Sequence, residues 1–306
     1  MAKTAFLFAG QGAQKPGMAG DLYEKHLIVR ETFDEASQIL GYDLRDLIDN
    51  DNDKLNQTRH TQPAILTTSV AIFRLLKEKG YQPDVVAGLS LGEYSALVAS
   101  DALAFEDAVA LVAKRGEYME TAAPAGSGKM VAVMNAEASL IEKICQEASK
   151  KGIVTPANYN TPSQIVIGGE VAAVNYAVEL LKEAGVKRLI PLKVSGPFHT
   201  ALLEPASQQL AEALEEISFS DFKIPLIGNT EAKVMQRSDI KALLTRQVME
   251  PVRFYESILA MKDLGMTTCV EIGPGKVLSG FIKKIDKTIP VSTVENIDSL
   301  NAFLEG

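Results

Sequence analysis

The stretch that decides the fold is Val85–Gly92, VVAGLSLG, in which an apolar strand runs directly into the pentapeptide G-x-S-x-G. A helical pattern follows from Glu93 to Ser100. Strand, G-x-S-x-G and helix in this order are typical of a nucleophile elbow, a sharp turn that lifts a serine hydroxyl above the edge of a sheet. The helix behind it directs free N–H groups at negative charge developing on a bound carbonyl. Ser90 is therefore the predicted nucleophile.

Composition limits the classes of function. With 306 residues, 46% of them hydrophobic, the chain is long enough for one large domain or two unequal ones. A net charge of −8 without a basic arm argues against general nucleic-acid binding. No signal-peptide pattern and no membrane-length apolar run is found, so we expect a cytoplasmic protein without membrane contact. Cys145 and Cys269 match no metal or disulfide spacing, which predicts packed thiols and no metal site.

The first and last parts of the chain alternate strands with helices. That alternation predicts a mostly parallel sheet covered on both faces, an α/β-hydrolase-like doubly wound core. The expected strands are Ala5–Phe8, Val85–Gly88, Ile224–Ile227 and Thr268–Ile272, and the expected helices are Ile28–Leu40, Gln62–Lys79, Phe105–Thr121, Leu202–Glu216, 239–249 and 254–264.

The middle of the chain follows another order. After a linker-like turn at Pro124–Gly128, the pattern is βαββαβ, which is the ferredoxin-like unit. A small fold inside a larger one predicts an inserted subdomain at 126–195, a discontinuous core at 1–125 and 196–306, and a cleft between them. The expected elements are strands Met130–Met134, Val154–Asn158, Gln164–Gly168 and Lys187–Lys193, with helices Ala138–Lys150 and Val171–Ala184.

A serine needs a base, and the chain has only three histidines. His26 lies in a polar helix end and is interpreted as solvated, and His60 beside Arg59 as structural or exposed. His199 follows the last strand of the small subdomain, where the chain returns to the core and lines the predicted cleft, so it is the predicted base. No Asp or Glu near it suggests an orienting group, which leaves a backbone carbonyl as the alternative.

The loop Phe8–Gln14 also follows a strand. A nucleotide-binding loop is one interpretation, but G-x-G-x-x-G fails because Lys15 occupies the last glycine position. The other is an oxyanion hole, because an elbow needs a second donor besides the amide of Leu91, and the amide of Gln11 is the natural candidate.

Two further segments leave alternatives open. Arg115 ends an apolar helical stripe, so it either points inward toward an anion or lies on the surface beside Lys114, and periodicity does not decide between them. Gly273–Lys276, GPGK, lacks the spacing of a phosphate loop and is interpreted as a turn before a helix.

Taken in order, these segments resemble the malonyl-CoA:acyl-carrier-protein transacylases of bacterial fatty-acid synthesis over nearly the whole chain. The resemblance rests on several motifs in the family's order, which are more specific than the pentapeptide alone. They are Phe8–Gln14, Thr61–Ala64, Gly88–Tyr94, Asn158–Pro162, Gly196–His199 and Glu271–Lys276.

The resemblance implies roles for the candidate residues. Ser90 would be the acylated nucleophile and His199 the general base and acid in a ping-pong reaction. The amides of Gln11 and Leu91 would hold the oxyanion. Arg115 would grip the free carboxylate of the malonyl group, which favours the inward orientation.

Other positions also correspond to the family pattern. Gln247 matches the position whose main-chain carbonyl orients the histidine, and Asn158 and Asn160 are expected to contribute to the site. Phe198 resembles the malonyl-selecting form of its motif. Many relatives carry histidine where this chain has Leu89, so any contact made by that histidine is absent here.

The implied substrate is malonyl-CoA, and the implied acceptor is the phosphopantetheine thiol of acyl carrier protein, with no permanently bound cofactor. The resemblance implies a role in fatty-acid chain elongation, and we expect a monomer. Lys187-Arg188 and Lys283-Lys284 are weak candidates for docking the carrier protein. A serine hydrolase with the same elbow and a non-catalytic binding module are the rival functions.

Overall fold

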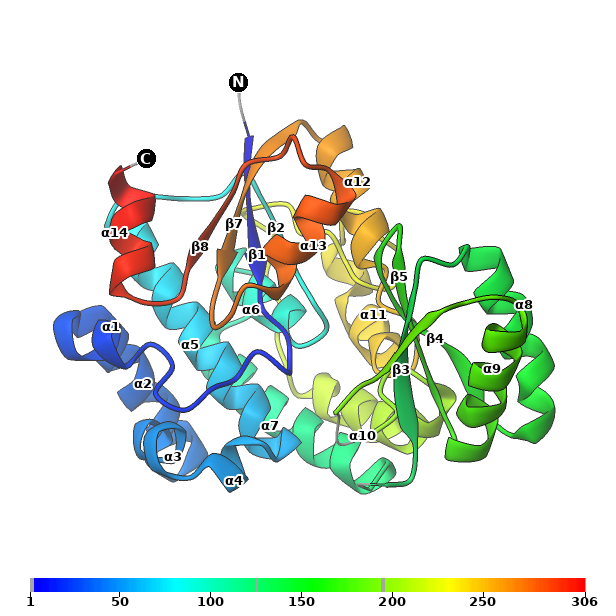
Figure 1. The fold of residues 1–306 in the computed structure, drawn as a ribbon. Helices are drawn as coiled ribbons and strands as arrows, with labels where there is room; N and C mark the ends of the chain where they lie inside the picture. The colour runs from blue at the N-terminus through cyan, green and yellow to red at the C-terminus, as the bar shows by residue number, and fades with distance from the viewer. Residues whose placement is uncertain (1–2, 125, 194–195, 306) are drawn as a thin grey trace.

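A parallel sheet of four strands lies at the centre of the larger part of the molecule (Figure 1). In spatial order its strands are β2 (Val85–Gly88), β1 (Lys3–Phe8), β7 (Met266–Ile272) and β8 (Val291–Val294). The computed structural model describes residues 3–124, 126–193 and 196–305. Because helices cover both faces, the central strands are continuous apolar runs, and every residue of β2 is buried. The predicted parallel α/β core is confirmed.

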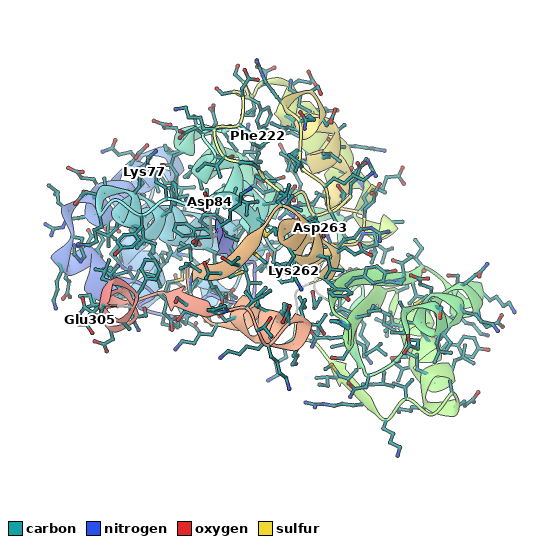
Figure 2. The ribbon with its side chains drawn as sticks, turned by 90° about the horizontal axis from the view of Figure 1, so that it is seen from above. Lys77, Asp84, Phe222, Lys262, Asp263 and Glu305 are labelled. Carbon is teal, nitrogen blue, oxygen red and sulfur yellow. The ribbon has the colours of Figure 1, made fainter. Side chains whose placement is uncertain are left out.

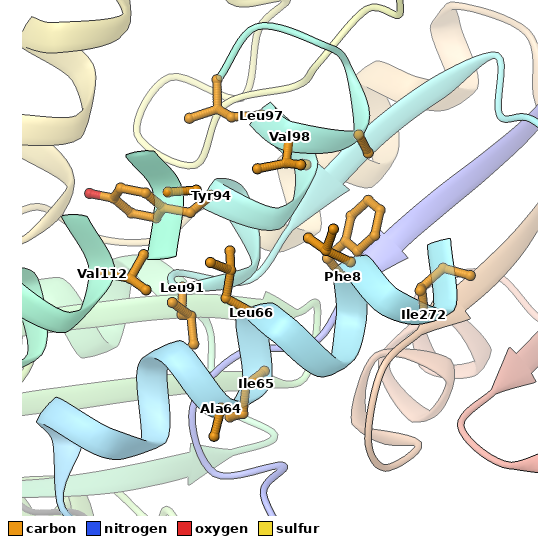
Figure 3. Packing of buried hydrophobic residues seen from close by; sticks show 14 of the residues in the cluster. Phe8, Ala64, Ile65, Leu66, Leu91, Tyr94, Leu97, Val98, Val112 and Ile272 are labelled. Carbon is orange, nitrogen blue, oxygen red and sulfur yellow. The ribbon is translucent and has the colours of Figure 1, made fainter. Parts of the chain in front are cut away.

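Helices surround this sheet, and α5 runs through the interior beside it. Its residues Ala64–Leu66 pack with Phe8 of β1, Ile272 of β7 and Leu91 of the elbow (Figure 3). The helices of this part are α1 (Gly20–Lys25), α2 (Leu27–Leu40), α3 (Leu44–Asn50), α4 (Asn52–Leu55), α5 (Thr58–Glu78), α6 (Gly92–Ala99), α7 (Phe105–Ala122), α10 (Glu204–Glu215), α11 (Ile240–Gln247), α12 (Phe254–Asp263), α13 (Val277–Ile285) and α14 (Ile297–Glu305), with short 3-10 turns at Ala201–Leu203 and Arg237–Asp239.

A second, antiparallel sheet forms a separate subdomain. Its spatial order is β4-β5-β3-β6, and two helices cover one face (Figure 1). Along the chain the elements are β3 (Lys129–Met134), α8 (Ala138–Ala148), a 3-10 turn (Ser149–Lys151), β4 (Val154–Thr161), β5 (Gln164–Gly169), α9 (Val171–Glu183) and β6 (Arg188–Pro191). The predicted βαββαβ order is confirmed.

The strand β3 joins the two parts through its alternation. Val131 and Val133 belong to the core of the small subdomain, whereas Met130, Ala132 and Met134 belong to the core cluster of the larger part. Successive side chains of a strand point to opposite faces, so one strand contributes to both cores. The open face of the small sheet is thereby turned toward the larger part.

For the large sheet, one predicted strand is wrong and one observed strand lacks a prediction. The segment Ile224–Ile227 forms no strand but only isolated bridges, in which Val86 donates to the Pro225 carbonyl at 2.9 Å and accepts from Ile227 at 3.0 Å. Pro225 has no N–H, so a regular ladder stops there. The edge strand β8, which pairs with β7, was not predicted at all.

The domain boundaries at 125/126 and 195/196 stay predictions, since residues 125, 194 and 195 lie outside the described part of the chain. Within that part, no helix is long and apolar enough to cross a membrane.

Both ends of the described chain lie beside one loop at the amino-terminal edge of the large sheet. The amide of Thr4 donates to the Asp84 carboxylate at 2.8 Å, and the rings of Tyr81 and Phe303 lie 5.0 Å apart. Figure 2 views the molecule from this amino-terminal edge of the sheet, where Asp84, Lys262 and Glu305 are labelled.

Candidate active site

The turn between β2 and α6 has the geometry of a nucleophile elbow. Ser90 adopts a left-handed backbone conformation with φ 53°, which is uncommon for a residue with a side chain. Two glycines allow the close packing that the turn requires. A Cβ built on Gly88 would lie 1.9 Å from the Gly92 carbonyl carbon, and one built on Gly92 would lie 2.1 Å from the Phe8 carbonyl oxygen. The glycines are therefore dictated by backbone contacts on both sides of the serine.

The base predicted from the sequence meets this serine. His199 Nε2 lies 2.8 Å from Ser90 Oγ, although the two residues are 109 positions apart. On the other side of the ring, Nδ1 lies 2.7 Å from the main-chain carbonyl of Gln247. A carbonyl only accepts, so Nδ1 carries the proton and Nε2 is left to accept from the serine hydroxyl. The backbone carbonyl takes the place of an orienting carboxylate.

Burial sets the charge of this histidine. His199 is 4% exposed, and burial together with the nearby Arg115 cation lowers its pKa to about 4. Both effects disfavour the imidazolium form. The ring is therefore neutral at neutral pH and ready to take a proton.

Arg115 points inward, which resolves the alternative that periodicity left open. It is 1% exposed and donates to Gln62 Oε1 at 2.8 Å, Gln247 Oε1 at 3.1 Å and Ser90 Oγ at 3.2 Å. Its guanidinium also lies 5.3 Å from the centre of the Tyr94 ring. Within the described ranges its hydrogen-bond partners are all neutral, and Nε has none. A buried cation in this state is prepared to bind an anion.

The two residues predicted to supply oxyanion donors lie near the serine, since Leu91 follows it and Gln11 lines the same cavity. Leu91 follows Ser90 directly, and its side chain is buried in the same cluster as Leu66 and Val112 (Figure 3). The side chain of Gln11 donates to Thr58 Oγ1 at 3.1 Å, which fixes the loop after β1 against α5. Among the described residues, neither amide donates to another backbone group.

A cavity of about 160 Å³ opens above the serine. Its walls come from both sheets, as the predicted insertion requires. The elbow and the loop after β1 form one wall, and the small subdomain forms the other. The cavity is lined by Gly10, Gln11, Leu89, Ser90, Met119, Met130, Asn158, Asn160, Val166, Leu192, Phe198 and His199.

Asn229 is a residue of the site that was missed from the sequence. Its side chain donates to the Gly88 carbonyl at 2.6 Å and accepts from the Ser90 amide at 2.7 Å, so it satisfies the backbone on both sides of the elbow. The side chain of Gln247 completes this network by donating to the Ser90 carbonyl at 3.0 Å. No sequence spacing marks Asn229, because it reaches the elbow from a turn 139 residues away.

Glu93 was also missed. Its carboxylate is buried and accepts from the amide of Asn229 at 2.6 Å. Burial raises its pKa to about 7, against the lowering effect of that hydrogen bond. The carboxyl therefore supports the network beneath Ser90 by holding the backbone of Asn229.

The remaining candidates lie elsewhere. His60 lies near Tyr42, with Nδ1 3.2 Å from the phenol oxygen, and His26 separates α1 from α2. Cys145 and Cys269 are buried, and burial raises the pKa of each thiol to about 12, which fits packed thiols. No cluster of metal-ligating side chains occurs in the described segments.

Comparison with known proteins gives matches over nearly the whole chain. The family described as Acyl transferase domain matches residues 5–300. The Malonyl CoA-acyl carrier protein transacylase of Bacillus subtilis (strain 168) is 48% identical, covering 97% of this chain and 96% of that protein. The solved structure of MCAT from Streptococcus pneumoniae matches with a TM-score of 0.98 and 73% identity over 99% of both chains. A solved type II PKS acyl-carrier protein in complex with its malonyl-transacylase matches with a TM-score of 0.96 and 42% identity, again over 99% of both chains.

Proposed function

This chain belongs to the malonyl CoA-acyl carrier protein transacylase family, and from that membership we propose that Ser90 carries the malonyl group between donor and acceptor. The protein is an acyltransferase that moves malonyl from malonyl-CoA to acyl carrier protein for fatty-acid synthesis. The transfer takes two steps, and Ser90 and His199 take part in both.

In the first step, Ser90 Oγ attacks the thioester carbonyl carbon while its proton passes to His199 Nε2. The C–S bond then breaks, and the imidazolium returns the proton to the sulfur of CoA. A contact of 2.8 Å between Oγ and Nε2 is within the range for such a transfer. The carbonyl of Gln247 keeps the ring in the tautomer that this exchange needs.

In the second step, the phosphopantetheine thiol gives its proton to His199 and attacks the malonyl-Ser90 ester. The C–O bond to the serine breaks, and His199 reprotonates Oγ. In both steps the carbonyl oxygen becomes negative, and the amides of Gln11 and Leu91 receive it. A preorganised pair of N–H groups stabilises this charge without reorganising during the reaction.

Arg115 is proposed to hold the free carboxylate of the malonyl group. A planar guanidinium binds a carboxylate with two parallel hydrogen bonds, and the pair is strong in a buried site. Ser90 Oγ lies 3.2 Å from Arg115 Nη2. A malonyl group whose carboxylate is held by Arg115 would therefore have its thioester carbon close to Ser90. The side chain would thereby select dicarboxylic acyl groups.

One observation carries this assignment: a neutral serine–histidine pair lies beside a buried cation whose hydrogen-bond partners, in the described chain, are neutral. Mixing the protein with malonyl-CoA and recording its intact mass tests it. We expect a lasting malonyl adduct on Ser90, release of one CoA, and transfer of the adduct to added carrier protein. Ser90→Ala should form no adduct. Free malonate without an adduct would indicate a hydrolase instead, and no release of CoA would indicate a binding module.

We also propose that the protein works in the cytoplasm, in keeping with two unpaired thiols in the described chain, and that it is a monomer. Light scattering during size-exclusion chromatography gives the mass of the particle in solution. A dimer mass would contradict the monomer.

A further inference from the structure

The segment Glu271–Lys276 has no part in the two transfer steps, yet it lies beside the loop that carries Gln11. It contains the end of β7 and the turn before α13. Its first residue, Glu271, is buried, and its carboxylate accepts from the amides of Leu278 at 3.0 Å and Ser279 at 2.7 Å. The start of α13 is thereby fixed to β7, and the turn between them has a defined position.

The turn touches both ends of the loop Ala9–Gln14, which we call the oxyanion loop. The Ala9 amide donates to the Ile272 carbonyl at 3.3 Å. A Cβ built on Gly273, where φ is +113°, would lie 2.4 Å from Ser69 Oγ and 3.4 Å from the Cβ of Ala9. A Cβ built on Gly275 would lie 3.7 Å from the Cβ of Ala13. The turn therefore lies within van der Waals range of the loop at its beginning and near its end, and Gly273 also allows its close approach to Ser69 of α5.

Glu295 connects the turn to the residue after the loop. This carboxylate is 8% exposed, and its Oε2 accepts from Lys15 Nζ at 2.6 Å and from the Gly275 amide at 3.0 Å. Lys15 immediately follows the oxyanion loop in sequence. A single buried oxygen thus ties the loop to the turn, with a charge-assisted hydrogen bond on one side.

Few hydrogen bonds within the oxyanion loop fix its shape, and one of its outside anchors is the bond from Gln11 Nε2 to Thr58 Oγ1. Within the loop, the Ala13 amide donates to the Gly10 carbonyl at 3.4 Å and the Gly12 amide to Gln14 Oε1 at 2.8 Å. Gly12 has φ +101°, a conformation that glycine adopts at little steric cost. The direction of the Gln11 amide therefore depends on anchors outside the loop.

We propose that Glu295 is a positioning residue for acyl transfer, which holds the oxyanion loop through Lys15 and Gly275 so that the Gln11 amide points at the reacting carbonyl oxygen. The proposal rests on the proposed role of Gln11 as an oxyanion donor. It gives the C-terminal motif a catalytic purpose, because the motif supplies the surface on which the loop rests.

The test is the burst of CoA release when malonyl-CoA acylates the enzyme without carrier protein. The side chain of Lys15 is 51% exposed, so Lys15→Met removes the charge without opening the core. Complete loss of an oxyanion donor costs about 100- to 1,000-fold in rate, so a displaced donor should slow the burst about 10-fold. Binding of an unreactive malonyl-CoA analogue, with a methylene in place of the sulfur, should stay within about twofold. Lys15→Arg, which keeps the bond to Glu295, should restore most of the rate.

Lys262→Met is the matched control. It breaks an ion pair of the same 2.6 Å length, with Asp286, at the end of the molecule seen in Figure 2. Its burst rate should equal that of the parent. Glu295→Gln keeps an acceptor for Gly275 but loses the ionic bond, and its rate should fall in the same direction as that of Lys15→Met.

Two outcomes would overturn the positioning role. One is an unchanged burst rate in Lys15→Met and Glu295→Gln, and the other is an equal loss of analogue binding and burst rate in both. Either outcome leaves the proposed acyl transfer through Ser90 intact if Ser90→Ala still shows no burst. A persistent burst in Ser90→Ala would instead refute the covalent mechanism.

Discussion

His199 occupies a buried position in which its surroundings determine its protonation before substrate arrives. Loss of water and the Arg115 cation both disfavour the charged ring and lower its pKa to about 4. The backbone carbonyl of Gln247 orients the ring without adding a negative charge. A carboxylate there would raise the pKa of His199, so a carbonyl in that place keeps the ring neutral over a wide pH range.

The pH profile of acylation should report this arrangement. The quantity to plot against pH is the burst rate divided by the dissociation constant of malonyl-CoA. In the parent, this ratio should fall on the acid side with a midpoint well below pH 6.5, the ordinary pKa of histidine. Arg115→Gln removes a cation that disfavours the imidazolium form, so its midpoint should move to higher pH. Stopped-flow pH jumps measure the acid limb of the parent and of the variant before either protein unfolds at low pH. A midpoint that moves to lower pH in the variant would contradict the electrostatic assignment.

Arg115 should also decide which acyl groups react. In Arg115→Ala, malonyl transfer should fall about 100-fold further than acetyl transfer, because only malonyl loses a buried ionic partner. Rates with malonyl-CoA and acetyl-CoA on the same preparation provide the comparison. Equal losses for both substrates would place the malonyl carboxylate elsewhere.

At the level of single residues, the sequence predicts those whose chemistry follows from a local pattern. Ser90 is marked by its elbow, and His199 by its place after the last strand of the insertion. Asn229 and Glu93 carry no such pattern, because their role depends on contacts between segments far apart in the chain. The orientation of Arg115 was open for the same reason, since periodicity does not show whether its side chain meets other segments of the chain or the solvent.

At the level of elements, the elbow depends on close contact between backbone segments. The first residue of α6, Gly92, packs against the backbone at the end of β1, so that two neighbouring strands and one helix meet without side chains between them. This contact brings the oxyanion loop close to the serine.

Gly92→Ala should destabilise the protein by about 3 kcal/mol, because the new methyl group meets the Phe8 carbonyl oxygen and the backbone must move. Gly280→Ala is the matched control, since Gly280 lies in α13 with open space around its Cα. That variant should gain up to about 1 kcal/mol from helix propensity. Urea unfolding of both variants tests the pair. Equal effects would mean that the elbow tolerates a side chain.

The type of an element was predictable in two cases. One is a helix whose apolar periodicity extends over many residues, and the other is a buried strand that forms a short, continuous apolar run. The helix expected at Ile28–Leu40 was found at Leu27–Leu40, ending at Gly41 with φ 75°. By contrast, β8 is only four residues long and has one buried residue, so it carries no clear periodic signal. Its pairing with β7 comes from the tertiary structure.

At the level of the whole molecule, the site exists only because two sheets face each other. The serine and the oxyanion loop follow strands of the parallel sheet, while Asn158, Asn160 and Val166 reach the cavity from the antiparallel one. The order βαββαβ predicts that an insertion is present and that a cleft follows from it. The size of the cavity and the polar network beneath it come from packing between segments that no local pattern relates.

That network should affect the pH dependence of folding. Glu93 has its pKa raised to about 7 in the native state, so the native state binds more protons than the unfolded state between pH 4.5 and 7. Its contribution to stability is therefore lost as pH rises. Relative to the parent, Glu93→Gln should gain about 2 kcal/mol in unfolding free energy between pH 5 and pH 8. Urea titrations at both pH values measure it, and an equal difference at the two would show that the pKa of Glu93 is not raised in the native state.

The two ends of the described chain meet at the Tyr81–Asp84 loop, whereas the serine opens at the opposite edge of the sheet. A tether or an affinity handle attached at either end would therefore leave the path of the pantetheine arm clear. An immobilised or fused enzyme of this architecture should still turn over its substrates.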